Sequence, residues 1–288
     1  DNFSQLKTGA FLLKNPPRIT VKGTLFLKNI SKEFRGGAFM YTCAFPTILP
    51  CSVVFSSQKP TRFINNLSKD AGGAIYWTDL SPEFEVGSVE FLDNHSDYGP
   101  KIGATPKSLV HLLKDEIEVV EPSFLFVPDP LPDNDDGDEK ERPPLLDDFA
   151  PRMYSQMRSG QTLEDDLFFG IVDTYGQIIK TETGATARIE ADPSTTEKTA
   201  ITSNLKTSVS GIFNFKGIKI ITTPGTALTL NLSSPRVSRS MNSPLKFLFS
   251  YRHCRRGEIL LGSGECYICG SNVGPEASFG ARTTTEYS

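Results

Sequence analysis

The sequence has few of the residues and patterns on which most enzyme sites depend. Only three His and one Trp occur among its 288 residues. It also lacks a phosphate-binding loop, a nucleotide-binding glycine fingerprint, a nucleophile elbow and a His-Glu-x-x-His pattern. These absences remove the motif-based reasons to expect a nucleotide-binding protein, a serine hydrolase or a zinc peptidase. We therefore predict a protein that is not an enzyme and that uses no cofactor.

Long apolar runs and a strong excess of charge are also missing. No run of about 18 apolar residues occurs, so we expect no membrane contact within this segment. The formal net charge is −4, and this balance gives no support for nucleic-acid binding. The chain opens on Asp1 with neither a Met nor a signal peptide, and we expect it to be a segment of a longer protein.

A short phrase, Phe-x-x-Asn-x-Ser, occurs three times in the first third of the chain. Its copies begin at Phe26, Phe63 and Phe91, and Gly-Gly-Ala phrases that contain Gly37 and Gly73 follow the first two. A repeat of this length indicates units that bury an apolar face by stacking on one another. We predict an all-β protein that begins with coils of a right-handed parallel β-helix, with these Phe and Gly residues in its core. An antiparallel sandwich with chance similarity between strands is the alternative.

The Asn of each repeat also begins a sequon for N-glycosylation. These positions are Asn29, Asn66 and Asn94, and Asn2 and Asn231 begin two further sequons. An Asn inside a turn ladder is enclosed, whereas a glycosylated Asn must face solvent. The sequence leaves both possibilities open for the repeat positions. Asn231 lies on a polar strand face and is the better glycan candidate, and Asn2 is a further candidate.

Five cysteines are few but patterned. Cys43 and Cys51 flank an insert between the first two repeats and could close it with a disulfide. Cys254, Cys266 and Cys269 follow near the end of the chain, and one cysteine is left over. A partner outside this sequence would explain the unpaired one. Together with the sequons, the cysteines favour an oxidising route, and we predict an extracellular or cell-surface location.

The chain divides into four predicted regions. Residues 1–127 hold the coils and a closing segment, and residues 128–150 form an acidic, Pro-rich linker. A calcium loop is an alternative for this linker, although its spacing does not fit an EF-hand. Residues 151–250 contain about seven short strands and are predicted to form an immunoglobulin-like sandwich without the Cys-Trp-Cys core. Residues 251–288 begin a disulfide-rich module.

Three parts of the chain resemble known families. Over roughly residues 20–105, Phe-x-x-Asn with Gly-Gly-Ala resembles the polymorphic outer-membrane-protein repeat of bacterial adhesins and of large extracellular ciliate proteins. This resemblance implies a parallel β-helix with a structural or adhesive role. Val-Asp-x-Tyr-Gly-Gln from Val172 onward resembles immunoglobulin-like modules of surface proteins of the invasin kind.

The tail resembles the opening of an ephrin-receptor-like cysteine-rich module, through Cys-x-x-Gly-Glu followed by Cys-x-x-Cys. That resemblance implies a bond between Cys254 and Cys266, and it leaves Cys269 for a cysteine beyond this chain. A zinc site made of the three cysteines and His253 is the alternative. His253 is adjacent to Cys254, however, so the two side chains cannot easily point at one ion.

We therefore expect a non-enzymatic structural or adhesive segment of a large secreted or cell-surface protein, able to assemble into a filament or surface layer. Its expected partners are copies of itself, other surface proteins, or glycans. One alternative is a glycan- or cell-binding adhesin module that uses the turn at Trp77-Thr78-Asp79. Another is a polysaccharide lyase or hydrolase, whose candidate residues are Lys69, Asp70, Asp79, Glu83, Asp93 and Asp97.

Overall fold

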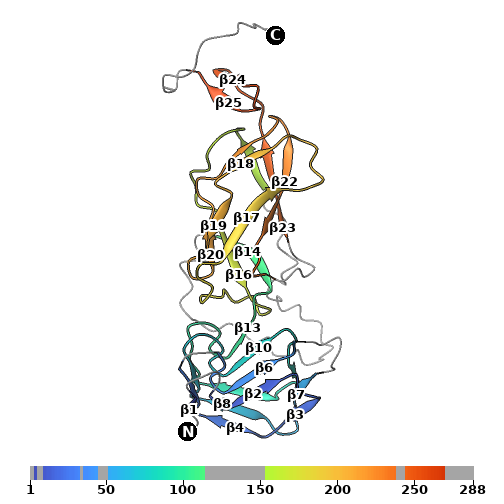
Figure 1. The fold of residues 1–288 in the computed structure, drawn as a ribbon, viewed down its shortest axis with the longest axis vertical. Coiled ribbons are helices and arrows are strands. Elements are labelled where there is room, and N and C mark those ends of the chain that lie inside the picture. Colours follow the sequence, from blue (N-terminus) through green and yellow to red (C-terminus); the bar gives the residue numbers. More distant parts are fainter. Residues whose placement is uncertain are drawn as a thin grey trace, which may run out of the picture.

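The structure is a computed structural model that describes residues 3–4, 9–32, 35–44, 51–113, 153–237 and 244–269. All regular elements within these ranges are β-strands, so the predicted all-β class is confirmed. Among the described residues there is consequently no helix of the length and apolarity needed to cross a membrane. Figure 1 shows two bodies placed end to end, with the N-terminus at the far end of the first.

The first body is a stack of parallel strands, here called the parallel stack. It contains four sheets with the orders β1-β5-β9, β13-β10-β6-β2, β11-β7-β3 and β12-β8-β4. Its strands are β1 (Phe3–Ser4), β2 (Phe11–Lys14), β3 (Ile19–Val21), β4 (Leu25–Leu27), β5 (Ile30–Ser31), β6 (Phe39–Thr42), β7 (Val53–Phe55), β8 (Thr61–Ile64), β9 (Leu67–Ser68), β10 (Ile75–Thr78), β11 (Glu83–Phe84), β12 (Val89–Leu92) and β13 (Ile102–Ala104).

Each turn of the chain contributes one strand to each of these sheets. Strands β1 to β4 form the first layer, β5 to β8 the second and β9 to β12 the third, and β13 belongs to a partial fourth. The repeated Phe occupy the same register position, because Phe26 pairs with Phe63 and Phe63 with Phe91. Their rings stack with centroids 4.8 and 5.4 Å apart. Phe26 and Phe63 are buried, and Phe91 is half-buried.

The two glycines of each Gly-Gly-Ala phrase are needed for different reasons. Gly36 and Gly72, the first of each pair, have φ of +74° and +67°, which side chains with a Cβ rarely adopt. Gly37 and Gly73, the second of each pair, lie against the next layer. A Cβ on Gly37 would lie 2.0 Å from the carbonyl oxygen of Gly73. The phrase therefore provides a tight turn and then close contact between layers.

The second body contains two main sheets, with the orders β14-β16-β20 and β15-β23-β22-β17-β19, and a small sheet of β18 and β21. Its strands are β14 (Ser108–Leu112), β15 (Met153–Met157), β16 (Phe168–Val172), β17 (Thr186–Ala191), β18 (Ala200–Thr202), β19 (Leu205–Thr207), β20 (Ile212–Asn214), β21 (Lys219–Ile221), β22 (Ala227–Ser233) and β23 (Leu245–Tyr251). Apolar side chains of both main sheets fill one core, which includes Phe169, Ile189, Phe213, Leu230 and Phe249.

Strand β14 shows how the two bodies are connected along the chain. It comes from the predicted closing segment of the first region, yet it pairs antiparallel with β16 of the second body. The chain therefore passes directly from the top of the parallel stack into the second body. The predicted boundary near residue 127, the acidic linker 128–150 and its calcium alternative all lie outside the described residues.

A small hairpin follows the second body at the end remote from the N-terminus (Figure 1). Its strands are β24 (Glu258–Leu260) and β25 (Cys266–Ile268), which pair antiparallel. A disulfide between Cys254 and Cys266 ties this hairpin to the end of β23. The described chain therefore consists of a parallel stack, a two-sheet body and a stapled hairpin in that order.

Candidate functional site

A column of buried amides lies at one corner of the parallel stack and is called the Asn ladder here. Asn29 Nδ2 donates to Asn66 Oδ1 and Asn66 Nδ2 donates to Asn94 Oδ1, each at 2.8 Å. The backbone N–H groups of Asn29 and Asn66 donate to the same two oxygens at 3.0 Å. Asn66 Nδ2 also reaches the carbonyl oxygen of Phe26 at 3.1 Å. The repeated Asn therefore satisfies buried polar groups of the adjacent layers.

The ladder determines what the three repeat sequons can do in the folded protein. All three Asn are buried, and the nitrogen to which a glycan would be attached is already a donor within the stack. A glycan at Asn29, Asn66 or Asn94 is therefore incompatible with this arrangement. Asn2 lies outside the described residues. Asn231 is half-buried on β22, opposite Glu190 and Lys246.

A second buried polar group lies where the parallel stack meets the second body. Asp173 follows β16 and is fully buried. Its Oδ2 accepts a hydrogen bond from the Tyr98 hydroxyl, which comes from the last turn of the stack. Its Oδ1 accepts from the backbone N–H groups of Tyr175 at 2.8 Å and Gln177 at 3.0 Å. We call this group, with the contacts of Tyr175 and Gln177 to the stack, the junction.

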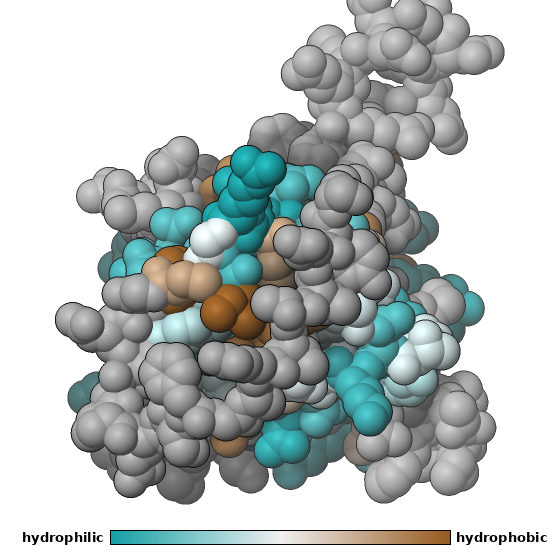
Figure 2. Space-filling view, turned by 90° about the horizontal axis from the view of Figure 1, so that it is seen from above, coloured by the Kyte–Doolittle hydropathy of each residue, from teal (hydrophilic) through white to brown (hydrophobic). Residues whose placement is uncertain are grey.

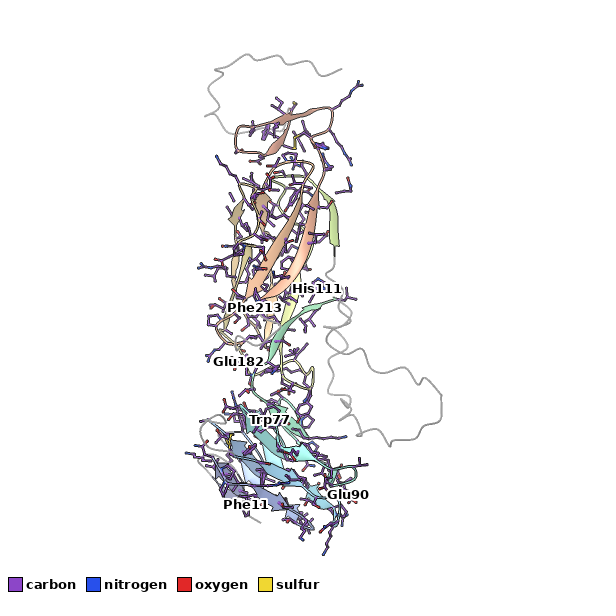
Figure 3. The ribbon with its side chains drawn as sticks, turned by 90° about the vertical axis from the view of Figure 1, so that its right-hand side faces the viewer. Phe11, Trp77, Glu90, His111, Glu182 and Phe213 are labelled. Carbon is purple, nitrogen blue, oxygen red and sulfur yellow. A yellow bond between two sulfur atoms is a disulfide. The ribbon has the colours of Figure 1, made fainter. Side chains whose placement is uncertain are left out.

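Two more side chains of the same turn reach across the junction. Gln177 Nε2 donates to the carbonyl oxygen of Ile102 on β13 at 3.0 Å, and it also contacts Asp173 Oδ2 at 3.2 Å. Trp77 Nε1 on β10 donates to the Tyr175 hydroxyl at 3.1 Å, with the two rings nearly perpendicular. Figure 3 shows Trp77 at the end of the stack that faces the second body. The turn after β16 is therefore fitted into the end of the stack.

Burial controls the charge state of this junction. It raises the pKa of Asp173 to about 6, although the hydrogen bonds from Tyr98, Gln177 and Tyr175 act in the opposite direction. Burial, and then the neighbouring charge of Asp173, raise the pKa of Tyr98. The Tyr98 hydroxyl also lies 3.0 Å from the carbonyl oxygen of Ala104, so a second acceptor is available to it. The Asp173 carboxylate has four donors from the protein around it, which fits a structural tie better than a reacting group.

Tyr76 adds a cation contact beside the junction. Its ring is part of the apolar core of the second body, although it belongs to β10 of the stack. The guanidinium of Arg35 lies over the Tyr76 ring at 5.0 Å from its centroid, and Arg35 Nη1 donates to the Tyr76 hydroxyl. Burial raises the pKa of Tyr76, and Arg35 opposes that shift. The outer face of β10 is therefore covered partly by the second body and partly by a cation.

Both predicted disulfides are present. Cys43 is bonded to Cys51, which closes the insert between the first two repeats. Cys254 is bonded to Cys266, as the resemblance of the tail implied. Cys269 is exposed and is the free cysteine of the described residues. The sulfur atoms of Cys254 and Cys266 lie near the Glu258 carboxylate, but their bond removes the thiolates that a zinc site of this kind requires.

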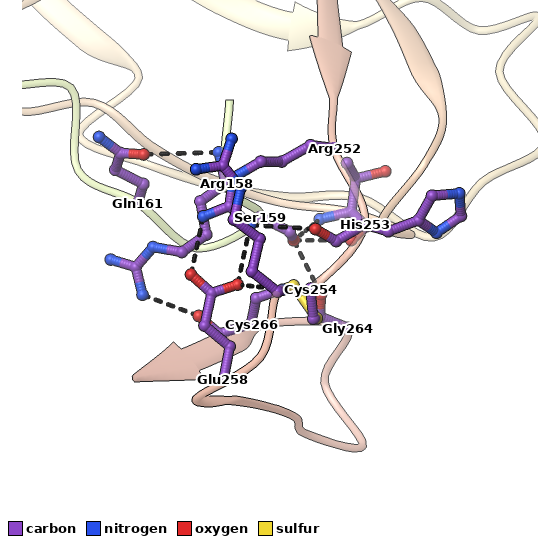
Figure 4. The surroundings of a disulfide bond; sticks show 11 residues. Arg158, Ser159, Gln161, Arg252, His253, Cys254, Glu258, Gly264 and Cys266 are labelled. Carbon is purple, nitrogen blue, oxygen red and sulfur yellow. Dashed lines mark hydrogen bonds and ion pairs between the residues drawn. A yellow bond between two sulfur atoms is a disulfide. The ribbon is translucent and has the colours of Figure 1, made fainter. Parts of the chain in front are cut away.

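Charge pairing holds the stapled hairpin on the second body (Figure 4). Arg252 makes two bonds to the Glu258 carboxylate, at 2.8 and 2.7 Å, and both side chains are largely buried. The Arg252 bonds hold the pKa of Glu258 at about 2. Ser159 Oγ donates to the carbonyl oxygens of Thr222 and Gly264, and Arg158 Nη1 donates to that of Cys266. The hairpin is therefore anchored by hydrogen bonds as well as by its disulfide.

The residues proposed for the adhesin and lyase alternatives are not placed as a glycan-binding surface or a shared catalytic site would require. Trp77, proposed as an exposed glycan contact, is buried against Tyr175, so this part of the adhesin alternative is wrong. The lyase candidates are spread over separate corners of the stack. Asp79 follows β10, Glu83 begins β11, and Asp93 lies in the turn after β12, at φ +50°. The other candidates, in the loops that follow β9 and its counterpart in the fourth layer, are Lys69, Asp70 and Asp97.

Sequence reasoning missed the junction. In the sequence, Asp173 to Gln177 show only the resemblance to immunoglobulin-like modules, and nothing gives Tyr98 a role. The Asp-x-Tyr-x-Gln spacing does contain a local signal, because an Asp oxygen that accepts the N–H two residues later forms an Asx turn. Nothing local indicates that this turn is buried by a segment 75 residues earlier in the chain.

Comparisons of the chain with protein-family models, with curated proteins and with solved structures give no match. Its function has therefore to be inferred from the contacts and surfaces of the chain itself. The Asn ladder and the junction are the two buried polar groups that organise these surfaces.

The Asn ladder predicts a strong stability effect at its centre. Replacing Asn66 by Ala removes its contacts to both neighbouring layers, leaves the Asn29 amide without its acceptor and takes one donor from the Phe26 carbonyl oxygen. We expect the free energy of unfolding to fall by roughly 3 kcal/mol, measured by urea denaturation. Asn65→Asp is the matched control, because Asn65 is exposed and its counterpart in the next layer is Asp93 at the same positive φ. Equal stability of the two variants would contradict the role of the ladder.

The junction predicts that stability depends on pH through Asp173. Its pKa is about 6 in the folded protein and about 3.9 when the chain unfolds, so the folded state binds the proton more tightly. Its contribution is therefore greatest below pH 4 and is lost as pH rises through 6. Between pH 5 and pH 7.5 we expect the free energy of unfolding to fall by about 1.4 kcal/mol from this group. Asp173→Asn cannot ionise, and an identical pH response in this variant would remove the assignment.

Proposed function

We propose that the chain is a non-enzymatic structural or adhesive segment of a large secreted or cell-surface protein, and that it acts as a stiff spacer. The observation that carries this proposal is the junction. A buried carboxylate, a Tyr hydroxyl, a Trp and a Gln connect the parallel stack to the second body, so the two meet through specific side-chain contacts. The elongated arrangement of the two bodies suits a spacer, which holds the neighbouring parts of a larger protein at a fixed separation (Figure 1).

The proposal includes a finer description of both bodies. The parallel stack would be the C-terminal coils of a right-handed parallel β-helix, supported by its parallel pairing and by the recurrence of Phe and Asn in each layer. The second body would be an immunoglobulin-like sandwich, supported by its two sheets around one apolar core. The hairpin with its disulfide would begin a cysteine-rich module.

The proposed location is extracellular. The two disulfides suggest an oxidising environment, which extracellular proteins share. We also propose kinship with the large ciliate-type surface proteins that carry polymorphic outer-membrane-protein repeats. This is supported by the register of the repeated phrases, because one phrase lies in each layer.

Exposed apolar side chains support the adhesive half of the proposal. On the outer face of the β12-β8-β4 sheet, Leu27, Ile64 and Leu92 form a row across three layers, with Leu27 42% and Leu92 53% exposed. The hairpin carries a second group, made of Ile259, Leu260, Leu261 and Ile268. Figure 2, which looks onto the hairpin end, shows hydrophobic side chains gathered among hydrophilic ones. Contiguous apolar groups on a surface commonly mark contact sites for other molecules.

A stiff spacer predicts a particular response in solution scattering. The wild-type chain should fit one elongated arrangement of its two bodies, because the junction fixes their angle. Trp77→Ala combined with Gln177→Ala removes two of the contacts across the junction, and we expect its small-angle X-ray profile to require a range of angles. Arg188→Ala, which removes only an exposed ion pair in the second body, is the control. A wild-type profile that already requires a range of angles would overturn the spacer proposal.

Peptide mapping of the natively sourced protein tests the proposed location. Without reduction, we expect the Cys43–Cys51 and Cys254–Cys266 bonds to be intact, because a secreted protein keeps such bonds. Asn29, Asn66 and Asn94 should carry no glycan, even if Asn231 or Asn2 does, because the ladder encloses them. Free thiols at all four of these cysteines would contradict an extracellular location, and a glycan on a repeat Asn would contradict the ladder.

A further inference from the structure

One side of the parallel stack carries an open apolar row. In the sheet β12-β8-β4 the repeated Phe point inward, and side chains alternate along a strand, so the residues on either side of each Phe point outward. With the turn residue that follows each strand, they form the lateral face: Leu25, Leu27, Lys28, Arg62, Ile64, Asn65, Glu90, Leu92 and Asp93. Figure 3 shows Glu90 at the side of the stack. A coil that precedes the first layer would stack on the strand edges and leave this side open.

The apolar part of the lateral face is continuous from layer to layer. Leu27 pairs in register with Ile64, and Ile64 pairs with Leu92, so the three side chains form one row along the stack. Leu25 stands beside this row and is 54% exposed. Among the described residues, Leu25, Leu27 and Leu92 all remain exposed. A row of this kind is a candidate contact site for another molecule.

The charges of the lateral face are ordered along the stack. The turn position after each strand holds Lys28 in the first layer, Asn65 in the second and Asp93 in the third, all exposed and at φ of +52°, +52° and +50°. On the other side of the apolar row, Arg62 lies in the second layer and Glu90 in the third, with both side chains more than half exposed. The face therefore has a basic end and an acidic end, with the aliphatic row running between them.

This order makes the lateral face complementary to its own reversed copy. If a second copy faces it with its stack running in the opposite direction, Leu27 meets Leu92 of that copy, and Ile64 meets Ile64 on the two-fold axis. Lys28 then meets Asp93 of the second copy. Arg62 lies between its own Glu90 and Glu90 of the second copy. A copy running in the same direction would instead set Lys28 against Lys28 and Asp93 against Asp93, which like-charge repulsion disfavours.

We propose that the lateral face binds a second copy of this chain, face to face and with the two stacks antiparallel. The contact is isologous, because the same patch serves on both copies. Three short strands offer far less than the roughly 800 Å² per partner of a stable complex, so the contact is weak and acts where many copies are held close together. The inference rests on the adhesive half of the proposed function, for which it names the partner and the surface.

Cysteine cross-linking detects a weak contact of this kind. The chain carries Cys269→Ser, so that its free cysteine does not react. Ile64→Cys places a thiol on the two-fold axis, and under mild oxidation it should cross-link to itself roughly tenfold faster than a thiol elsewhere on the surface, because the contact raises its effective concentration. Val209→Cys is the control, since Val209 is 72% exposed and belongs to the second body. Equal rates for the two variants would overturn the proposal.

A mixture of two variants tests the antiparallel orientation. Leu27→Cys and Leu92→Cys should cross-link to each other faster than either does to itself, because these positions meet only between opposite layers of the two copies. If each variant cross-linked faster to itself than to the other, the stacks would run in the same direction. That result would overturn the arrangement and the charge complementarity on which it depends.

A charge exchange tests the complementarity directly. Added to Ile64→Cys, Lys28→Asp should slow cross-linking severalfold, because it sets like charges against each other, and further addition of Asp93→Lys should restore the rate. Both positions have the same turn conformation, so each residue type already fits there. Lys198→Asp makes the same change of net charge on the second body and should have little effect. An exchange that fails to restore the rate would contradict the proposed contact.

Thiol labelling distinguishes a second copy from other occupants. In a dilute solution of the chain, Leu92→Cys should react with a maleimide about as fast as Val209→Cys, because both side chains are exposed. Much slower labelling of Leu92→Cys would mean that a segment of the same chain covers the face, and it would overturn the proposal. None of these measurements depends on Trp77 or Gln177 at the junction. The stiff-spacer proposal can therefore stand or fall separately.

Discussion

The buried amide column at the corner of the parallel stack is the constraint on which the other features of that body depend. Asn66 bonds to Asn29 on one side and to Asn94 on the other, so the layers can meet only in one register. A shift of one residue would place the Phe columns outside and the exposed residues between them inside. The register in turn sets Gly37 directly against the Gly73 carbonyl oxygen, where no larger residue fits. One hydrogen-bonded column thus determines the aromatic core and the tight turns together.

The end of the stack that faces the second body must be covered in another way, because no further layer of the stack packs on it. Here the chain uses a turn of the second body. Asp173 enters as a buried acid, and it is tolerated because Tyr98, Tyr175 and Gln177 supply its donors. Apolar contact completes the cover, since Tyr76 and Tyr98 of the stack belong to the core of the second body. The two bodies consequently share part of one interior.

Much of the stack could be predicted from its repeats, because residues at equal positions of a repeat meet equal surroundings. The spacing of Phe26, Phe63 and Phe91 indicated stacked strands, and the all-β class and both disulfides are confirmed. The junction could not be predicted. Its contacts join residues far apart in the sequence, and a Trp or an Asp in a turn looks the same whether or not another segment covers it. For that reason Trp77 was expected on the surface, and it is buried.

The insert closed by Cys43 and Cys51 has a consequence for how this protein can vary. The first two repeated Phe are 37 residues apart and the next two 28, yet the strands on either side of the insert keep their register with the third layer. The corner between β6 and β7 therefore holds seven more residues than its counterpart between β10 and β11, and the ladders on both sides of it are kept. Such a corner is a natural graft point. Foreign loops anchored there by a short disulfide should be displayed from the side of the rod while the scaffold beneath them stays unchanged.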